Sequence, residues 1–232
     1  MDQLGVGLVW YVVLLFSLTF HEAAHAWAAR RGGDDTAYLG GQVSLDPRPH
    51  IRREPFGMVI FPILTFVLSH SMLGWASTPY DPAWAQAHPR RAAAMSAAGP
   101  AANAILVLAA ALAIRAGIAA DVFHAPASID FEHLVAANSD GIAASVALLL
   151  SVLFTLNLLL LIFNLIPFPP LDGANAIGIF FSDAGARRVQ GLLRSPQLAL
   201  VGLLLAWLAM PRIFGPIHRL AVNLLYPDLG YG

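Results

Sequence analysis

His21-Glu22-Ala23-Ala24-His25 lies near the end of an apolar stretch that runs from Leu4 to Ala29, and this placement decides the fold class. A run of about 20 mostly apolar residues is long enough to cross a bilayer as a helix. Ionisable side chains inside such a helix are costly, so they normally face the protein interior and serve a function. The sequence therefore predicts a membrane protein that carries polar chemistry inside its first span.

The composition of the whole chain favours the same class. Hydrophobic residues make up 58% of the 232 residues and charged residues only 12%, whereas a soluble domain carries roughly 25% charged residues. The net charge of -1 provides no basic field that would attract nucleic acid. The absence of cysteine excludes disulfides and thiolate metal ligands. Because no repeat or low-complexity segment divides the chain, we expect one membrane domain over residues 1–232.

Further apolar stretches predict an all-α membrane protein, a polytopic helical bundle with four to six membrane segments. The second, third and fourth stretches are Ala92–Ala119, Ile142–Ile166 and Gln197–Met210. Pro211 is expected to interrupt the fourth, and the tail after Pro216 to lie in the interface or complete a hairpin. The weaker segment Phe56–Leu73 has arginines beyond both ends, so we expect it to dip into the membrane and return.

The placement of arginine predicts the orientation of these spans. Arginines follow the first span, precede the second and follow the third, whereas the loop from Gly117 to Asp140 holds four acidic residues and no basic one. Cytoplasmic loops are enriched in Arg and Lys. We therefore expect a multi-pass protein of a cell membrane, such as a prokaryotic inner membrane, with His21 and His25 near the cytoplasmic side.

The spacing within the first motif predicts a metal site. Residues four positions apart share one face of a helix, so His21 and His25 can bind one Zn²⁺ while Glu22 lies beside it. Zinc lowers the pKa of a bound water to about 7, and a neighbouring carboxylate can then take its proton. In a soluble helix a motif of this kind is often a chance occurrence. Inside a span, three ionisable residues are hard to explain without a function.

Two histidines leave a tetrahedral zinc short of a third protein ligand. The candidate ligand, Asp172, lies in Asn164-Leu165-Ile166-Pro167-Phe168-Pro169-Pro170-Leu171-Asp172-Gly173, where prolines break the third span at its inner end. Broken backbone at membrane depth is tolerated only when it is buried in protein or lines a cavity. Two crossings return the chain to the side of His21 and His25. The alternative is an ordinary Asp-Gly turn after a helix.

At these motifs the chain resembles the site-2 protease (M50) family of intramembrane zinc metalloproteases, in its small prokaryotic form without a PDZ domain. The resemblance is carried by residues 21–25, 98–103 and 164–173, and by the linker elements 40–50 and 74–76. It implies zinc ligands His21, His25 and Asp172, with Glu22 as general base. It also implies that Gly40–Leu45 forms an edge strand or membrane-embedded hairpin after the first span.

Two asparagines are further candidates for the site. The resemblance places Asn164 near the metal, where its amide can donate to a developing oxyanion. Pairing of Asn164 with exposed carbonyls at the helix break is an equally good alternative. Asn103 follows Gly99-Pro100 in the second span, where it can bond across to the first span or help hold substrate, and we expect packing to be its main role.

The expected function is that of a zinc endopeptidase in the lipid bilayer, which hydrolyses peptide bonds of transmembrane protein substrates within or near their membrane segments. No nucleic-acid partner is expected. Two alternatives stay open, namely a membrane metal-ion transporter that uses the same ligands and an inactive zinc-bearing binding protein. A transporter has no need of Glu22 as a base. The sequence leaves the substrate and the oligomeric state undetermined.

Overall fold

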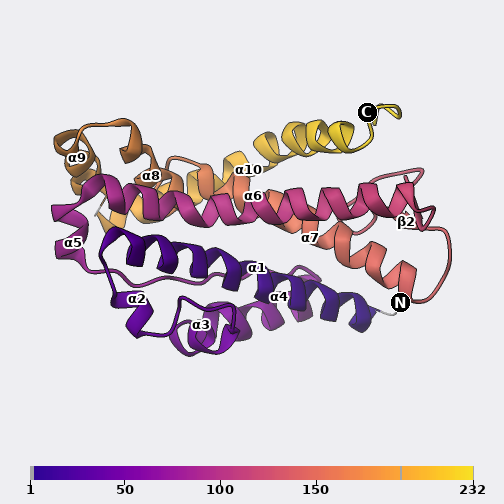
Figure 1. Cartoon of the computed structure of the whole chain (residues 1–232), viewed down its shortest axis with the longest axis horizontal. Helices are drawn as coiled ribbons and strands as arrows, with labels where there is room; N and C mark the ends of the chain where they lie inside the picture. The colour runs from indigo at the N-terminus through magenta and orange to yellow at the C-terminus, as the bar shows by residue number, and fades with distance from the viewer. Residues whose placement is uncertain (1–2, 194, 232) are drawn as a thin grey trace.

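Long apolar helices form the body of the protein in a computed structural model that describes residues 3–193 and 195–231. Among these residues, four helices are long and apolar enough to cross a membrane. They are α1 (Gln3–Gly32), α6 (Pro89–Ala119), α7 (Ile142–Leu165) and α10 (Pro196–Leu225). They run along the long axis of the molecule, and the chain begins and ends toward the same end of it (Figure 1). The expected all-α polytopic fold is confirmed, and the protein is a multi-pass membrane protein.

Short helices connect the long ones, most of them at the opposite end of the molecule from the termini. These are α2 (Thr36–Leu39), α3 (Pro47–Arg53), α5 (Pro82–Ala87), α8 (Asp172–Ala176), the 3₁₀ helix η2 (Ile177–Phe180) and α9 (Asp183–Leu193). Figure 1 shows α2, α5, α8 and α9 gathered there, around the end of α1 that carries the two histidines.

The segment between α3 and α5 runs along the molecule toward the start of α1 and then doubles back. The π-helical turn η1 (Phe56–Ile60) and α4 (Phe61–Ser69) lead toward the start of α1, where Gln3 Nε2 lies 3.1 Å from His70 Nδ1. The chain then runs back, and the Asp81 amide donates to the Asp34 carboxylate at 2.8 Å, beyond the other end of α1. The expected return of the chain after Phe56–Leu73 is therefore observed, with the Trp75 amide donating to the Gly57 carbonyl at 3.1 Å, and the dip of this segment into the membrane stays a prediction.

The last helix corrects one expectation. α10 continues without a break from Pro196 to Leu225, so Pro211 does not end the fourth span and the tail forms no hairpin. Proline removes one backbone hydrogen bond from a helix, but membrane helices tolerate it. The apolar residues on both sides of Pro211 and Pro216 favour continuation, since an exposed break in lipid would leave more backbone groups unpaired.

The strand predicted after the first span is also wrong. Gly40–Leu45 forms a turn and bends, in which the Gln42 amide donates to the Ala37 carbonyl at 2.9 Å. Gly41 has a φ of 77°, and the Asp46 side chain caps α3 by accepting from the Arg48 amide at 2.9 Å. These residues favour turns and a helix start over a strand.

Within the described residues, the pairing of strands occurs in the loop between α6 and α7. β1 (Phe123–His124) pairs antiparallel with β2 (Ala136–Ala137). The Tyr226 hydroxyl at the end of α10 donates to the Leu134 carbonyl of this loop at 2.8 Å. The loop is therefore tied to α10, at the end of the molecule where the termini lie.

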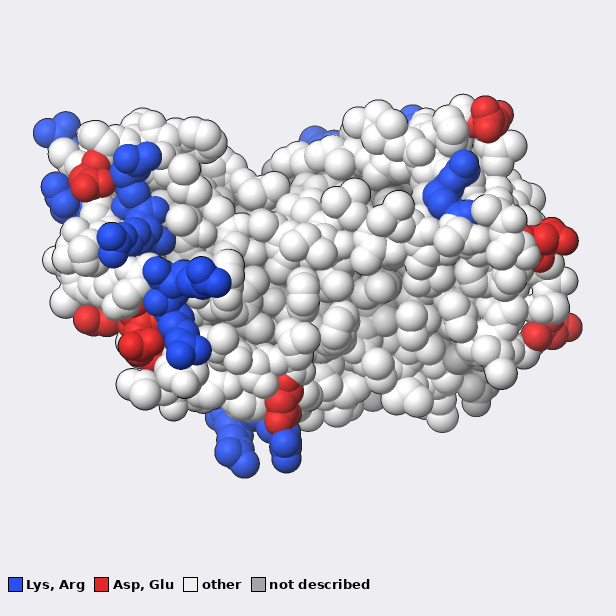
Figure 2. Space-filling view, viewed as in Figure 1, with Lys and Arg blue, Asp and Glu red and all other residues white. Residues whose placement is uncertain are grey.

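On the face shown in Figure 2, most charged side chains lie toward the two ends of the molecule, a further group projects at the lower edge near α3, and a largely uncharged band lies between the ends. Basic side chains predominate at the end of α5 and α9, and acidic side chains at the end of β2. Such a band matches the hydrocarbon core of a bilayer, which is about 30 Å thick.

Apolar and polar contacts together fix α1, α6 and α7 against one another. α6 packs against both α1 and α7. One apolar cluster joins α6, α7 and α10 around Phe154, and another joins α1, η1 and α7 around Leu14. The same three helices bury Ser17, Asn103 and Asn157 completely, each with 0% exposure. These polar residues build the surroundings of the candidate site.

Candidate metal centre

His21 and His25 lie one turn apart on the same face of α1, and this face is buried against α6. Each histidine is only 5% exposed. Their Nε2 atoms lie 2.9 Å from each other. The two ring nitrogens therefore converge on one point in the protein interior, as the helical spacing predicts.

Hydrogen bonds to the other ring nitrogens fix the tautomer of both imidazoles. His21 Nδ1 donates to Asn103 Oδ1 at 2.6 Å, and His25 Nδ1 donates to the Met95 carbonyl at 2.7 Å. Since each of these oxygens can only accept, the proton of a neutral ring stays on Nδ1. The lone pair of each Nε2 is then available to a metal ion, the arrangement usual for metal-binding histidine.

Asp172 comes back to the two histidines from beyond the end of α7. Its Oδ2 atom lies 3.0 Å from His21 Nε2 and 3.3 Å from His25 Nε2. The neighbouring Gly173 makes this return possible, because a Cβ atom there would lie 2.4 Å from the Leu165 carbonyl oxygen. The segment thus folds tightly onto the last turn of α7. The structure brings the three predicted ligands together.

The donor set fits zinc. Zinc binds histidine nitrogen and carboxylate oxygen at about 2.0–2.2 Å, which separates tetrahedral ligand atoms by about 3.3–3.5 Å. The ligand-atom separations here are 2.9, 3.0 and 3.3 Å. Two imidazoles and one carboxylate also leave one tetrahedral position open, as in catalytic zinc sites.

Gly99 of α6 closes the site from the side opposite α1. A Cβ atom at this position would lie 2.3 Å from His25 Nε2 and 2.4 Å from His21 Nε2. Only a residue without a side chain lets the α6 backbone approach the imidazoles this closely. The glycine therefore provides the space in which a ligand of the two nitrogens would lie.

Glu22 adjoins the histidines and is held by a residue from the returning segment. Its side chain is buried, and one ligand atom each of His21, Glu22 and His25 lie within 4.8 Å of one another. The Thr78 hydroxyl donates to Glu22 Oε2 at 2.6 Å and also lies 3.0 Å from the Glu22 carbonyl oxygen. A carboxylate in this position can exchange a proton with a group at the metal position.

Asn164 lies in the last turn of α7 and is partly exposed. Its Nδ2 atom donates to the Leu160 carbonyl at 3.0 Å, one turn back in the same helix. This bond agrees with the alternative in which Asn164 pairs with helix carbonyls. A role for its amide toward a substrate stays a prediction.

Sequence reasoning missed three residues around the site and ranked the role of a fourth too low. For Asn103 a bond across to the first span was the alternative to packing, and the structure has this bond, because the Asn103 oxygen accepts from His21. Asn157, Ser17 and Thr78 were not singled out, although the first two extend the hydrogen bonds of Asn103 and the third binds Glu22. Asn157 and Ser17 did carry a signal, because polar residues are uncommon inside apolar spans. Thr78 lies in an irregular segment, where a threonine carries no such signal.

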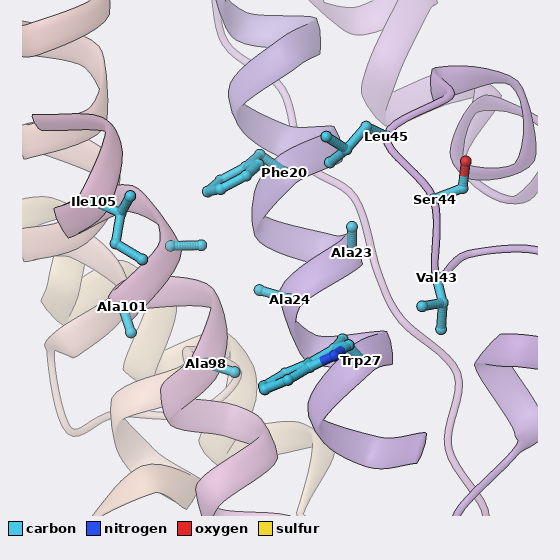
Figure 3. A pocket seen from close by; sticks show the side chains of 11 residues that line it. Phe20, Ala23, Ala24, Trp27, Val43, Ser44, Leu45, Ala98, Ala101 and Ile105 are labelled. Carbon is cyan, nitrogen blue, oxygen red and sulfur yellow. The ribbon is translucent and has the colours of Figure 1, made fainter. Parts of the chain in front are cut away.

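An apolar pocket of about 590 Å³ adjoins this region of α1. It lies between α1, α6 and the bends at Val43–Leu45 (Figure 3). Phe20 and Trp27 reach from α1 toward α6 (Figure 3), and Ala24, two positions after Glu22, lies between them on the helix. Trp27 is 53% and Ile105 56% exposed, so the pocket opens on the apolar outer surface of the bundle.

The site combines a buried His-Glu-x-x-His motif in one membrane helix with a carboxylate from the segment that follows a second membrane helix. This combination defines the class of membrane-embedded metallopeptidases. Comparison with known proteins gives the family. Residues 9–205 match the model of peptidase family M50, and the chain belongs to this family. The predicted family and its zinc dependence are thereby confirmed.

Two relatives illustrate this membership. The chain is 34% identical to "Putative zinc metalloprotease YwhC" of Bacillus subtilis (strain 168) over 168 residues, which are 72% of this chain and 66% of that protein. It is 32% identical to "Putative zinc metalloprotease Rip2" of Mycobacterium tuberculosis (strain ATCC 25618 / H37Rv) over 205 residues, 88% of this chain and 68% of that protein. The chain thus spans about two thirds of the length of these relatives. No solved structure gives a significant match.

Proposed function

We propose that this protein is an endopeptidase that hydrolyses peptide bonds of membrane-protein substrates within or beside their transmembrane segments. Zinc would be held by His21, His25 and Asp172. The observation that carries the proposal is the position of the Asp172 Oδ2 atom, 3.0 and 3.3 Å from the two imidazole nitrogens. When bound, zinc supplies a Lewis acid that polarises a carbonyl and makes water more acidic.

Glu22 is the general base in this proposal. Its buried carboxylate takes a proton from the attacking water and delivers it to the leaving amine. The Thr78 hydroxyl holds Oε2 at 2.6 Å and leaves Oε1 for this proton. Asn164 is proposed to donate to the developing oxyanion, which requires its amide to leave the Leu160 carbonyl.

The apolar pocket supports a membrane segment as substrate. It is lined by α1, α6 and the bends at Val43–Leu45, and it opens on the surface that faces lipid. A helix shields its peptide bonds by hydrogen bonding, so a substrate has to become extended before attack. We propose that an extended substrate lies in this pocket, next to the turn of α1 that carries Glu22.

The arginine-rich end of the molecule is proposed to face the cytoplasm. α1 then runs inward, and the metal centre lies near the cytoplasmic side of a cell membrane. Such a site suits regulated intramembrane proteolysis, which releases the cytoplasmic part of a membrane protein.

The metal-transporter alternative has less support. The described residues bring together one group of three or more potential ligands, at His21, Glu22 and His25, with Asp172 beside it. A transport path needs successive sites, and a hydrolase needs one site with a base next to it. The arrangement here, one site with a base next to it, is that of a hydrolase.

The Glu22→Gln variant tests the proposed hydrolysis. Glutamine has nearly the same shape but cannot take a proton, so we expect zinc content to stay at the wild-type level and cleavage to fall by about 10²-fold or more. Membranes from cells that express either protein are compared by mass spectrometry for peptides that end within transmembrane segments. Wild-type levels of these peptides with Glu22→Gln would contradict the assigned base.

A further inference from the structure

We propose that Asn103, Asn157 and Ser17 act as a chain of positioning residues that orients His21 and sets the zinc affinity of the site. This inference rests on the proposed zinc site and goes beyond the ligands and the base. We call these three side chains the polar relay. Their hydrogen bonds lead from α1 to α7, from α7 to α6, and from α6 back to α1.

Three short hydrogen bonds build the polar relay. His21 Nδ1 donates to Asn103 Oδ1 at 2.6 Å, and Asn103 Nδ2 donates to Asn157 Oδ1 at 2.8 Å. Asn157 Nδ2 then donates to Ser17 Oγ at 2.9 Å and also to the Leu153 carbonyl at 2.8 Å. Each amide therefore accepts on its oxygen and donates from its nitrogen.

This direction has a chemical consequence for His21. If the Asn103 amide were turned over, its NH₂ group would face the ring, and Nδ1 would have to accept instead of donating. The proton of the neutral imidazole would then move to Nε2 and occupy the position that the metal needs. The Asn157 oxygen prevents this, because it accepts from Asn103 Nδ2 and so fixes which end of the amide faces His21.

Burial makes the fixed direction costly to reverse. Ser17, Asn103 and Asn157 are each 0% exposed, so water does not replace a lost partner. Leaving a buried polar group without a partner costs about 1–3 kcal/mol. The polar relay thus stabilises one orientation of the amides, and with it one tautomer of the metal ligand.

The two histidines differ in how they are held. His25 donates to the backbone carbonyl of Met95, which the α6 helix fixes without any side chain. His21 depends on side chains from α6 and α7. The hydrogen bonds of the polar relay lead from Ser17 to His21, which lie one turn apart on α1, by way of α7 and α6. The packing of three helices therefore determines the orientation of one metal ligand. We therefore expect changes in the polar relay to act on the metal site through His21.

The decisive variant is Asn157→Leu, which leaves the zinc ligands and Asn103 in place. The zinc dissociation constant of the purified full chain is measured by competition with a chromophoric chelator. Loss of a partner behind a metal ligand typically weakens metal binding by 10–100-fold. We expect a loss of about this size for Asn157→Leu and for Asn103→Leu.

The double variant distinguishes a chain from two independent contributions. If Asn157 acts only through Asn103, then Asn103→Leu combined with Asn157→Leu weakens zinc binding no more than Asn103→Leu alone. Independent contributions would multiply the two losses. Multiplied losses would therefore overturn the polar relay.

Ser151→Ala is the matched control. Ser151 is also a fully buried hydroxyl of α7, but it accepts from the Leu134 and Val135 amides in the outer loop at 3.0 and 3.2 Å. This variant should destabilise the protein without changing zinc affinity. An equal loss of zinc affinity in Ser151→Ala would show a general effect of α7 and would overturn the inference.

The outcomes separate this inference from the proposed function. A wild-type protein that binds no zinc contradicts the proposed function itself. A wild-type protein that binds zinc together with an Asn157→Leu variant that binds it equally well overturns only the polar relay. Should Asn157→Leu fail to fold, Ser17→Ala removes a single oxygen from the far end and should weaken zinc binding less but measurably. Unchanged affinity in that folded variant would also overturn the inference.

Discussion

At the scale of single residues, polar side chains inside a membrane span are informative, because burying each one costs free energy unless it has a polar partner. His21, Glu22 and His25 interrupt an apolar span, and the structure gives each a hydrogen-bond partner. The carboxylate of Asp172 reaches the same point from another helix. The residues around these groups also have defined contacts with them, and two of these residues, Gly99 and Thr78, allow direct tests.

Gly99→Ala should damage the metal centre. The added methyl group would lie 2.3–2.4 Å from the Nε2 atoms of His25 and His21, so either the rings or the α6 backbone must move. We expect zinc affinity to fall by about tenfold or more, as for other disturbances of ligand orientation. Zinc titration of the purified variant measures this.

Gly215→Ala provides the control for this substitution. It is also a glycine inside a membrane helix, but a Cβ atom there has no neighbour within 4 Å. Helix propensity favours alanine over glycine, so this variant should be as stable as the wild type or slightly more stable. Wild-type zinc affinity in Gly99→Ala would contradict the steric argument.

Thr78→Val should slow catalysis while leaving zinc binding intact. Valine keeps the shape of threonine but loses the hydroxyl that donates to Glu22 Oε2. A hydrogen bond to a charged group is worth about 1.5–3 kcal/mol, which corresponds to a loss of about 10- to 100-fold in kcat. Steady-state kinetics with a cleavable membrane peptide measures this, and Thr78→Ser should restore most of the activity. A change in KM alone would show that Thr78 contacts substrate instead.

At the scale of elements, the segments between the spans position the site as much as the spans do. The chain from η1 through α4 and back carries Thr78 to Glu22 on the buried face of α1. Its return is anchored at Asp34, just beyond the end of α1. This buried carboxylate accepts from the Thr36 amide at 2.9 Å and from the Asp81 amide at 2.8 Å. The anchor connects α1, α2 and α5.

The anchor at Asp34 should make stability depend on pH. Burial alone would raise the pKa of this carboxyl, but hydrogen bonds from Thr36 and Asp81 outweigh it and hold the pKa below its ordinary value. A group whose pKa is lower in the folded state stabilises the fold above the unfolded pKa of about 3.9. That contribution disappears as the pH falls through the folded pKa.

We therefore expect Asp34→Asn to lower the thermal unfolding temperature at pH 7, with the difference from wild type shrinking as the pH falls below about 4. Thermal unfolding of both proteins between pH 3 and 7 measures this. Asp35→Asn is the control, since the neighbouring side chain is exposed and lies 3.8 Å from Arg30. A difference that persists unchanged at pH 3 would show that the charge of Asp34 does not contribute.

At the scale of the whole molecule, the four long helices, the returning segment and the distribution of charge agree with one another. An even number of crossings places both termini on one side, and Figure 1 shows them toward the same end. The basic side chains predominate at the other end (Figure 2). By the positive-inside tendency, we expect the basic end to face the cytoplasm and the loop between α6 and α7 to lie outside.

Single cysteine variants test this orientation without background, because the chain has no native cysteine. Ser128 lies in the loop between α6 and α7, Ser182 precedes α9, and both are exposed. A membrane-impermeant maleimide added to intact cells should label Ser128→Cys and should label Ser182→Cys only after the membrane is opened. The reverse pattern would invert the proposed orientation.

The sequence by itself determined that the first three spans exist and roughly where each begins and ends, since the length of an apolar stretch is a local property. It also determined the motif of His21, Glu22 and His25, because their helical spacing is local too. The predictions of a strand at Gly40–Leu45 and of a helix end at Pro211 were wrong. The backbone conformation that glycines and prolines adopt depends on the tertiary surroundings as well as on the local sequence.

The two intervening crossings and the family resemblance predicted that Asp172 meets His21 and His25, but only the tertiary structure decided how closely distant residues approach each other. Asp172 approaches His21 from 151 positions away in the chain, as 172 minus 21, and the residues between them do not encode that distance in any local pattern. The same holds for Thr78 beside Glu22 and for the amides behind His21. A hydrogen bond or a ligand set depends on a few tenths of an ångström, and only the packing of α1 against α6 and α7 fixes positions so closely.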